Sequence, residues 1–126
     1  MMFVMLLAAA AQAPSDKVDC RETATTQYEL TECARQHYIQ SDRALNSQWQ
    51  ATSSKARKYD QRTYPRFLNA QRAWLRYRDE TCGWVRGTFG GTIAPMNFFN
   101  CMETVTRRRT DELKHLAANP NSDEAI

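Results

Sequence analysis

Residues 68–82 read LNAQRAWLRYRDETC, and this stretch decides the fold because it joins a helical apolar stripe to a cysteine. One face of a helix through it carries Phe67, Leu68, Gln71, Trp74, Leu75, Arg78 and Cys82. Its three arginines do not share a face: Arg72 and Arg76 lie four residues apart, and Arg78 lies on the stripe. The stretch therefore predicts the inner face of a helical domain and not a basic surface that binds nucleic acid.

The composition of the chain also argues against nucleic acid as a partner. Its 126 residues suggest one domain, and 17 basic against 14 acidic residues leave a formal net charge of +3. DNA-binding domains concentrate a stronger positive charge on one face. The run Arg107-Arg108-Arg109 makes no such face, because consecutive helical residues point in different directions.

The residue patterns of an enzyme are missing as well. His37 and His115 have no nucleophile pattern beside them, and an exposed helix face accounts for Glu29 and Glu32 near His37. The Gly-rich residues 87–92 lack the lysine of a phosphate-binding loop. No CxxC motif is present, which argues against a zinc ribbon or a thioredoxin-like site. We therefore expect no enzymatic activity, no cofactor and no metal ion.

A long first helix is predicted after an irregular start. Thr26 and Glu29 form a capping-box pattern, in which a helix opens on Thr and carries Glu three residues later. No Pro or Gly interrupts residues 21–64, and apolar residues recur at helical spacing. We predict a helix over residues 26–58, preceded by an irregular polar segment, residues 14–25.

Two further helices make the expected fold class all-α, a small three-helix domain with a long helical hairpin stapled by two disulfides. The second helix begins near Arg66, with Pro65 in its first turn, and is expected to end at Gly83. The third opens at Pro95 and ends near Ala118.

The connection between these two helices holds all four glycines of the chain. Residues 83–94, GWVRGTFGGTIA, therefore predict a loop, with at most a short ribbon at residues 88–93. The domain is expected to span residues 14–118, and the tail, residues 119–126, is expected to be disordered.

The first thirteen residues, MMFVMLLAAAAQA, predict a secretory signal peptide. Residues 1–10 are an unbroken apolar run, and Ala11-Gln12-Ala13 matches the small-x-small cleavage pattern. The run is shorter than the ~20 apolar residues that span a bilayer. Because no Lys or Arg precedes it, the usual positive n-region would need a start codon upstream of Met1. We expect cleavage after Ala13 and a periplasmic or secreted mature chain without stable membrane insertion.

Four cysteines agree with export. An even number in a small exported chain predicts a disulfide framework, with three possible connectivities. Pairing of sequence neighbours is the simplest choice, which gives Cys20–Cys33 and Cys82–Cys101. Each bond closes a short loop, and the chain-entropy model gives such a loop roughly 3 kcal/mol of stabilisation.

Arg78 needs a partner, because an unpaired buried charge is strongly destabilising. An antiparallel hairpin centred near residue 59 would place Asp42 opposite residues 76–78. We predict that Asp42 and Arg78 meet between the first two helices, at least partly buried, with the guanidinium stacked on Trp74.

Taken in order, these residues resemble the N-terminal domain family of the lysozyme inhibitor LprI. The matching elements are Cys20, TECA at 31–34, Tyr38, Asp42, Leu45-Asn46, Trp49, AQRAW at 70–74, YRD at 77–79, Cys82, GGTIAPM at 90–96, Cys101, Thr106, Arg109 and Leu113. The resemblance implies a small helical, disulfide-bonded protein of the bacterial envelope. With the stripe analysis, it points to structural roles for Asp42, Asn46, Gln71, Trp74 and Arg78.

The resemblance also implies a protein partner, with lysozyme as the first candidate. A lysozyme cleft carries two catalytic carboxylates, which cationic or hydroxyl groups of an inhibitor could contact. The segment 83–94 supplies such groups and aromatic neighbours, and its candidate residues are Trp84, Arg86, Thr88, Phe89 and Thr92. Alternatively, Trp84 and Phe89 close the core beneath the loop. The second functional hypothesis is an envelope interaction or toxin-immunity protein, unrelated to lysozyme, that uses the same loop.

Overall fold

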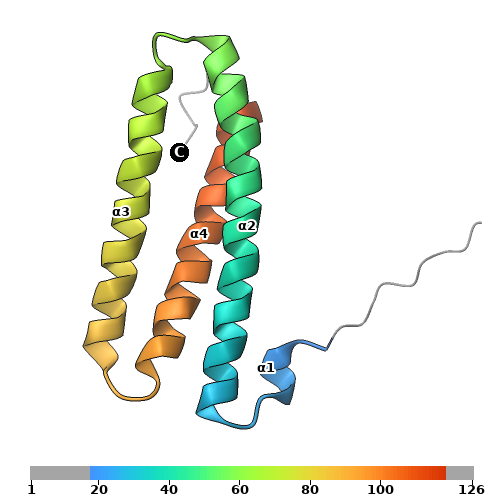
Figure 1. Ribbon diagram of the computed structural model, residues 1–126, viewed down its shortest axis with the longest axis vertical. Coiled ribbons are helices and arrows are strands. Elements are labelled where there is room, and N and C mark those ends of the chain that lie inside the picture. The colour runs from blue at the N-terminus through green and yellow to red at the C-terminus, as the bar shows by residue number, and fades with distance from the viewer. Residues whose placement is uncertain (1–17, 119–126) are drawn as a thin grey trace, which may run out of the picture.

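The computed structural model describes residues 18–118, which contain four helices and no strand (Figure 1). They are α1 (Cys20–Thr23), α2 (Gln27–Tyr59), α3 (Tyr64–Phe89) and α4 (Ala94–Ala118). The 33 residues of α2 span about 50 Å, at about 1.5 Å of rise per residue. The predicted all-α class with a long helical hairpin is confirmed, with a fourth, short helix added.

The predicted signal peptide, residues 1–13, and the predicted disordered tail, residues 119–126, lie outside the described residues. Between residues 18 and 118, no helix combines the length and the apolar character that crossing a membrane requires.

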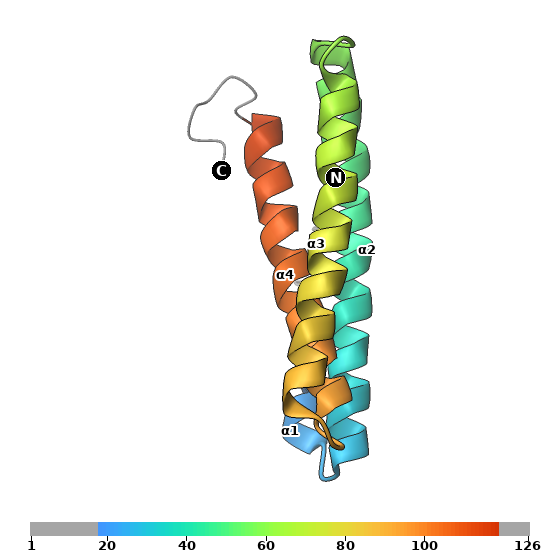
Figure 2. The ribbon, with the colours of Figure 1, turned by 90° about the vertical axis from the view of Figure 1, so that its left-hand side faces the viewer.

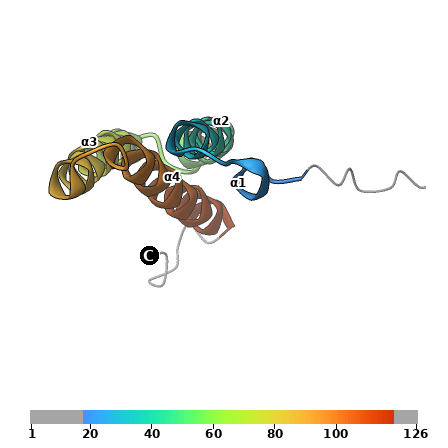
Figure 3. The ribbon, with the colours of Figure 1, turned by 90° about the horizontal axis from the view of Figure 1, so that it is seen from below.

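The α4 helix holds the bundle together. It packs most extensively on α2 and next on α3, whereas α2 and α3 touch each other little. Seen from below, α4 lies against both of the other long helices (Figure 3). Stacked rings add one contact at each of two junctions: Trp49 and Phe67 join α2 to α3 at 5.1 Å, and Tyr38 and Phe99 join α2 to α4 at 6.3 Å between centroids. The long hairpin is therefore closed mainly through a third helix.

The start of α2 agrees with the predicted capping box. Thr26 is the N-cap, and its Oγ1 accepts a hydrogen bond from the Glu29 amide at 3.1 Å. The Glu29 carboxylate reaches back one residue further than in the standard box, to the Thr25 amide at 2.7 Å. One unpaired amide of the first turn, that of Glu29, and the amide just before the N-cap, that of Thr25, are thereby satisfied.

The segment before α2 is not wholly irregular, which corrects the prediction for residues 14–25. Cys20–Thr23 forms α1, one helical turn whose N-cap is Asp19. The Asp19 carboxylate accepts from the Arg21 amide at 2.9 Å, and the bond to Cys33 anchors the turn to α2. A single turn has little stability of its own, so its dependence on the bond to Cys33 explains why sequence pattern alone missed it.

Helix α3 does not end at Gly83, which corrects a second prediction. It continues through Gly87 to Phe89, so most of the expected loop is helical, and no ribbon forms in residues 88–93. A glycine inside a helix costs only about 1 kcal/mol relative to alanine. Two helical glycines therefore do not suffice to end α3. The helix ends at Gly90, where the backbone turns to φ 59°.

Both predicted disulfides are confirmed. The Cα atoms of Cys20 and Cys33 lie 5.8 Å apart, and those of Cys82 and Cys101 lie 5.5 Å apart. These separations are within the usual range for disulfides. Together the bonds tie α1 to α2 and the last turns of α3 to α4.

The core contains as many buried polar or charged residues as buried apolar ones. Its fully buried side chains include Leu45, Leu113, Thr106 and Cys82. The buried polar and charged residues are Thr52, Gln71, Arg78, Glu103, Thr106, Arg109 and Thr110. Within the described residues, every buried side-chain nitrogen and oxygen has a hydrogen-bond partner. A polar core of this kind requires complete pairing, because one unsatisfied group would be strongly destabilising.

Three of the glycines make a matched test of the corrected helix end. Gly83 and Gly87 are helical, and a Cβ built on either meets nothing within 4 Å. Gly83→Ala or Gly87→Ala should therefore raise the free energy of unfolding by about 0.5–1 kcal/mol. Gly90→Ala should lower it by about 1–3 kcal/mol, because φ 59° with ψ −174° is a glycine conformation. Urea denaturation measures all three; destabilisation by Gly83→Ala would contradict a helix through this position.

Candidate functional site

All five residues predicted to contact a partner lie on one end of the bundle, which we call the α3–α4 tip (residues 84–93). The tip comprises the last turns of α3 and the connecting turn 90–93 (Figure 1). Trp84 is 71% exposed and Phe89 is 66% exposed, and Ile93 is exposed as well. The alternative in which Trp84 and Phe89 close the core beneath a loop is therefore wrong.

The polar candidates of the tip are partly engaged within the molecule. The Arg86 guanidinium lies 5.6 Å from the centre of the Phe98 ring on α4, a cation–π distance. The Thr88 hydroxyl donates to the Trp84 carbonyl at 2.9 Å. Thr92 is exposed in the turn. The tip thus offers two aromatic side chains to solvent, with its arginine held against α4.

The tip is a constrained structure. Gly90 and Gly91 both have positive φ, 59° and 66°, which turns the chain tightly from α3 into α4. Behind the turn, the Cys82–Cys101 bond fixes the spacing of the two helices. A surface held in this way loses little conformational entropy when it binds, which favours affinity.

Arg78 is the centre of the structural cluster predicted from the sequence. Its side chain is 9% exposed, and its Nη1 lies 3.3 Å from Asp42 Oδ1 on α2, the predicted contact. The same Nη1 donates to Thr106 Oγ1 on α4 at 3.4 Å, and Nε donates to Asp79 at 3.0 Å. Arg78 therefore bridges all three long helices. Asp42 binds through one nitrogen only, so a bidentate pair, which the guanidinium fork would allow, does not form.

A second buried arginine, which sequence reasoning missed, completes the cluster. Arg109 Nε donates to Gln71 Oε1 at 2.9 Å, and its Nη1 donates to Glu112 at 3.0 Å. Both arginines lie near the Trp74 ring, Arg78 at 5.3 Å and Arg109 at 5.8 Å from its centre. The spacing of Met102, Thr106, Arg109 and Leu113 on one face of α4 was the available signal.

Asn46 differs from the other residues assigned a structural role. It lies exposed on α2, one residue after the buried Leu45. No side-chain hydrogen bond to Asn46 is found among residues 18–118. Its structural role remains a prediction.

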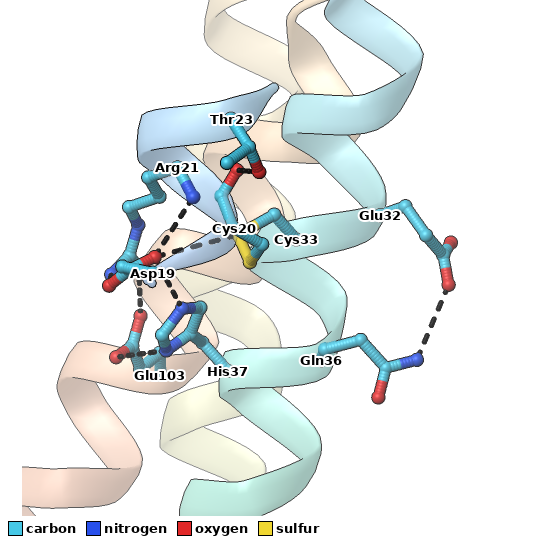
Figure 4. Close-up of a disulfide and its surroundings, with 9 residues drawn as sticks. All are labelled: Asp19, Cys20, Arg21, Thr23, Glu32, Cys33, Gln36, His37 and Glu103. Atoms are coloured by element: carbon cyan, nitrogen blue, oxygen red, sulfur yellow. Dashed lines mark hydrogen bonds and ion pairs between the residues drawn. A yellow bond between two sulfur atoms is a disulfide. The ribbon is translucent and has the colours of Figure 1, made fainter. Parts of the chain in front are cut away.

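A further polar cluster surrounds the Cys20–Cys33 bond (Figure 4). His37 lies between two carboxylates: its Nε2 is 3.2 Å from Asp19 Oδ1, and its Nδ1 is 4.0 Å from Glu103 Oε1. The Arg21 amide, which donates to Asp19, lowers the pKa of the Asp19 carboxyl, and His37 acts in the same direction. Asp19, Cys20, Cys33 and His37 are the residues here that could hold a metal ion.

The acidic residues that seemed closest to His37 in sequence do not join this cluster. The Glu29 carboxylate accepts from the Thr25 amide at the start of α2, and Glu32 pairs with Arg35 on the same helix. Asp19 and Glu103 take their place, from segments 18 residues before and 66 residues after His37.

A groove opens at the opposite end of the bundle, where α4 diverges from α3 (Figure 2). Its volume is about 1520 Å³, and it is lined by residues from the end of α2, the start of α3 and the end of α4. The lining includes four cationic side chains, Lys55, Lys58, Arg62 and Arg66. It also includes three aromatic rings, those of Tyr59, Tyr64 and Phe67. A bond from Lys55 Nζ to the Ala117 carbonyl, 3.0 Å, links α2 and α4 at this end.

Comparison with known proteins gives one family and one curated relative. The family model described as "Lysozyme inhibitor LprI" matches residues 20–113. A protein of Rhizobium meliloti (strain 1021), named "Uncharacterized protein R02472", is 37% identical over 121 residues, an alignment that covers 86% of this chain and 85% of the relative. No solved structure matches at a significant level.

Asp42→Ala should destabilise the fold, because it removes one of the carboxylates that offset the charge of buried Arg78. Asp42 is 37% exposed and Asp79 remains in contact, so we expect a loss of about 1–3 kcal/mol, less than for a fully buried pair. In the double variant Asp42→Ala/Arg78→Met, part of the loss should return. Urea denaturation of the wild type, Asp42→Ala, Arg78→Met and the double variant measures the coupling energy. Strictly additive losses would show that the two residues do not act together.

Ionisation of Tyr38 should lower the free energy of unfolding at alkaline pH. Burial raises the pKa of its phenol, while nearby Arg78 acts in the opposite direction. The raised folded-state pKa means that the contribution to stability is complete below about pH 10, and that it is lost as the pH rises through the folded value. Tyr38→Phe should therefore flatten the decline in the urea midpoint above about pH 10. Tyr28→Phe, at an exposed position, is the control and should leave the decline unchanged.

Proposed function

The chain belongs to the LprI family of lysozyme inhibitors, and we propose that it is an exported protein that inhibits a muramidase by inserting the α3–α4 tip into its substrate cleft. The family match over residues 20–113 reaches all four helices and includes both disulfides. We choose the tip as the inhibitory surface because two aromatic side chains, Trp84 and Phe89, are exposed on this constrained end of the bundle.

Two features support export to the periplasm or beyond. The apolar run and cleavage pattern of residues 1–13 are typical of a secretory signal. Both cysteine pairs are bonded, and structural disulfides persist mainly in oxidising compartments outside the cytosol. Export would also bring the protein to the cell wall, where muramidases act.

The shape of the molecule favours the tip over the groove as the inhibitory surface. A glycosidase cleft is concave, so a protein that blocks it must present a projection. The tip lies at the end of a narrow helical bundle (Figure 1). The groove at the other end is itself hollow. Aromatic residues dominate binding hot spots, and Trp84 and Phe89 are exposed there without a partner ring from the core.

Short-range contacts must supply the affinity. Animal lysozymes are basic, and this chain has a formal net charge of +3, so long-range attraction does not steer the two together. Burial of Trp84 and Phe89 against the cleft walls would provide the main favourable contribution to the binding free energy. Arg86 could then leave Phe98 and turn toward a catalytic carboxylate. Inhibition of a basic lysozyme should accordingly persist, or strengthen, when salt screens the repulsion.

The test is a muramidase assay on cell-wall suspensions with the purified mature chain. We expect inhibition at micromolar protein, and we expect the double variant Trp84→Ala/Phe89→Ala to weaken it about 30-fold or more, since each hot-spot truncation exceeds 1 kcal/mol. Tyr59→Ala, an exposed aromatic at the other end of the bundle, is the matched control and should inhibit as the wild type does.

Two outcomes would count against the proposal. Undiminished lysis at micromolar wild-type protein would reject lysozyme as the target and favour the envelope-interaction or immunity hypothesis. Equal inhibition by the wild type and the Trp84/Phe89 variant would retain the target but reject the tip. Circular dichroism of each variant shows whether the helices are intact.

A further inference from the structure

The Cys20–Cys33 bond lies among side chains that are typical metal ligands. Asp19 Oδ1 is 3.2 Å from His37 Nε2 and 3.9 Å from Cys33 Sγ. The ligand atoms of Asp19, Cys20, Cys33 and His37 all lie within 4.8 Å of one another. Among residues 18–118 this is the one place where three or more such ligands gather. The Cys82–Cys101 bond therefore has no such group of ligands around it.

We propose that reduction of the Cys20–Cys33 disulfide creates a tetrahedral zinc site formed by Asp19, Cys20, Cys33 and His37. Two thiolates, an imidazole and a carboxylate are all established zinc ligands. In a tetrahedral site with Zn–S near 2.3 Å and Zn–N or Zn–O near 2.0–2.1 Å, ligand atoms lie about 3.3–3.8 Å apart. The present spacing, within 4.8 Å, requires only side-chain adjustment once the sulfurs separate.

The redox step balances with a dithiol reductant. The S–S bond breaks, two electrons pass to the cysteines, and the reductant becomes a disulfide. Each new thiol then loses its proton to solvent as Zn²⁺ binds, because the thiolate is the ligand form. Oxidation reverses the sequence: the sulfurs rebond, and the ion loses two of its four ligands. The same pair of cysteines would therefore hold either a disulfide or a metal ion.

Neighbouring charges suit such a site. Two thiolates, the Asp19 carboxylate and Zn²⁺ together carry one net negative charge. Arg21 lies beside them, 3.8 Å from Asp19 Oδ2 and 2.8 Å from Glu103. Glu103 is buried and faces the His37 Nδ1, the nitrogen turned away from the proposed ion. A carboxylate behind a ligating histidine fixes its tautomer and orientation, so we assign Glu103 as a positioning residue.

The disulfide is open to a reductant. A hollow of about 310 Å³, lined by both cysteines and by the first turns of α2, adjoins the sulfurs. Cys20 and His37 are only partly buried, and Asp19 is 39% exposed. Cys33 is 3% exposed, so access to the sulfurs is through the hollow and from the Cys20 side. Both the reductant and the ion can therefore reach the proposed ligands from solvent.

The experiment is metal titration of the untagged full-length chain before and after reduction with a phosphine, which donates two electrons to the disulfide and is oxidised to the phosphine oxide with oxygen from water. Zn²⁺ binding is followed by competition with a chromophoric chelator, and Co²⁺ serves as the spectroscopic probe. We expect one ion per reduced chain, with thiolate-to-cobalt charge transfer and the intense visible bands of tetrahedral Co²⁺, and no such spectrum for the oxidised chain. Glu103→Gln should weaken Zn²⁺ binding about 10- to 100-fold while keeping the cobalt spectrum.

Paired variants separate this site from the other cysteines. Cys82→Ser/Cys101→Ser should bind as the reduced wild type does, whereas Cys20→Ser/Cys33→Ser and His37→Ala should lose the tight binding. Equal binding by the oxidised and reduced chains, or by the reduced chain and the Cys20/Cys33 variant, would overturn the proposal. If reduction unfolds the chain, circular dichroism must show that Zn²⁺ restores the helices, and failure to restore them would also overturn it.

Discussion

Two buried arginines around one tryptophan set the constraint on which the rest of the bundle depends. Arg78 and Arg109 each lie within 5.8 Å of the Trp74 ring centre, and their polar partners come from α2, α3 and α4. A guanidinium in the interior requires opposite charge and hydrogen-bond acceptors at fixed positions. Satisfying these two groups therefore constrains the register of the three long helices, together with the Cys82–Cys101 bond between α3 and α4. The contacts of Arg78 with Asp42 and Thr106 join α3 to both α2 and α4.

The two ends of the bundle differ in how they are held. Both disulfides tie their helices toward the end that carries α1 and the α3–α4 tip (Figure 1). Toward the other end no disulfide is present among residues 18–118, α4 diverges, and a groove opens. A covalently held end suits a binding projection, because little conformational freedom remains to be lost there. The fold thus places the exposed Trp84 and Phe89 at the end of the bundle that the disulfides hold.

Sequence reasoning identified the tip residues but assigned them to the wrong local structure. Gly83 is a reasonable helix stop in isolation, and only the packing of α3 on α4 shows that the helix continues to Phe89. The cluster around Cys20 was even harder to predict from the sequence. Cys33 and His37 lie one turn apart on α2, which is a recognisable pair. Asp19 joins them through the disulfide, and Glu103 joins them through the packing of α4, so sequence proximity pointed instead to Glu29 and Glu32.

The sequence by itself determined the local and covalent features of this protein: the all-α class, the capped start of α2 at Thr26, the neighbouring disulfide pairs and the inward-facing Arg78. Each of these follows from helical periodicity, capping chemistry or short loop closure, which act over a few residues. Tertiary structure alone decided the end of α3, the burial of Arg109 and the meeting of Asp19, His37 and Glu103. These depend on which helix faces which, and that choice is made when α4 packs against α2 and α3 and all the buried charges must find partners at once.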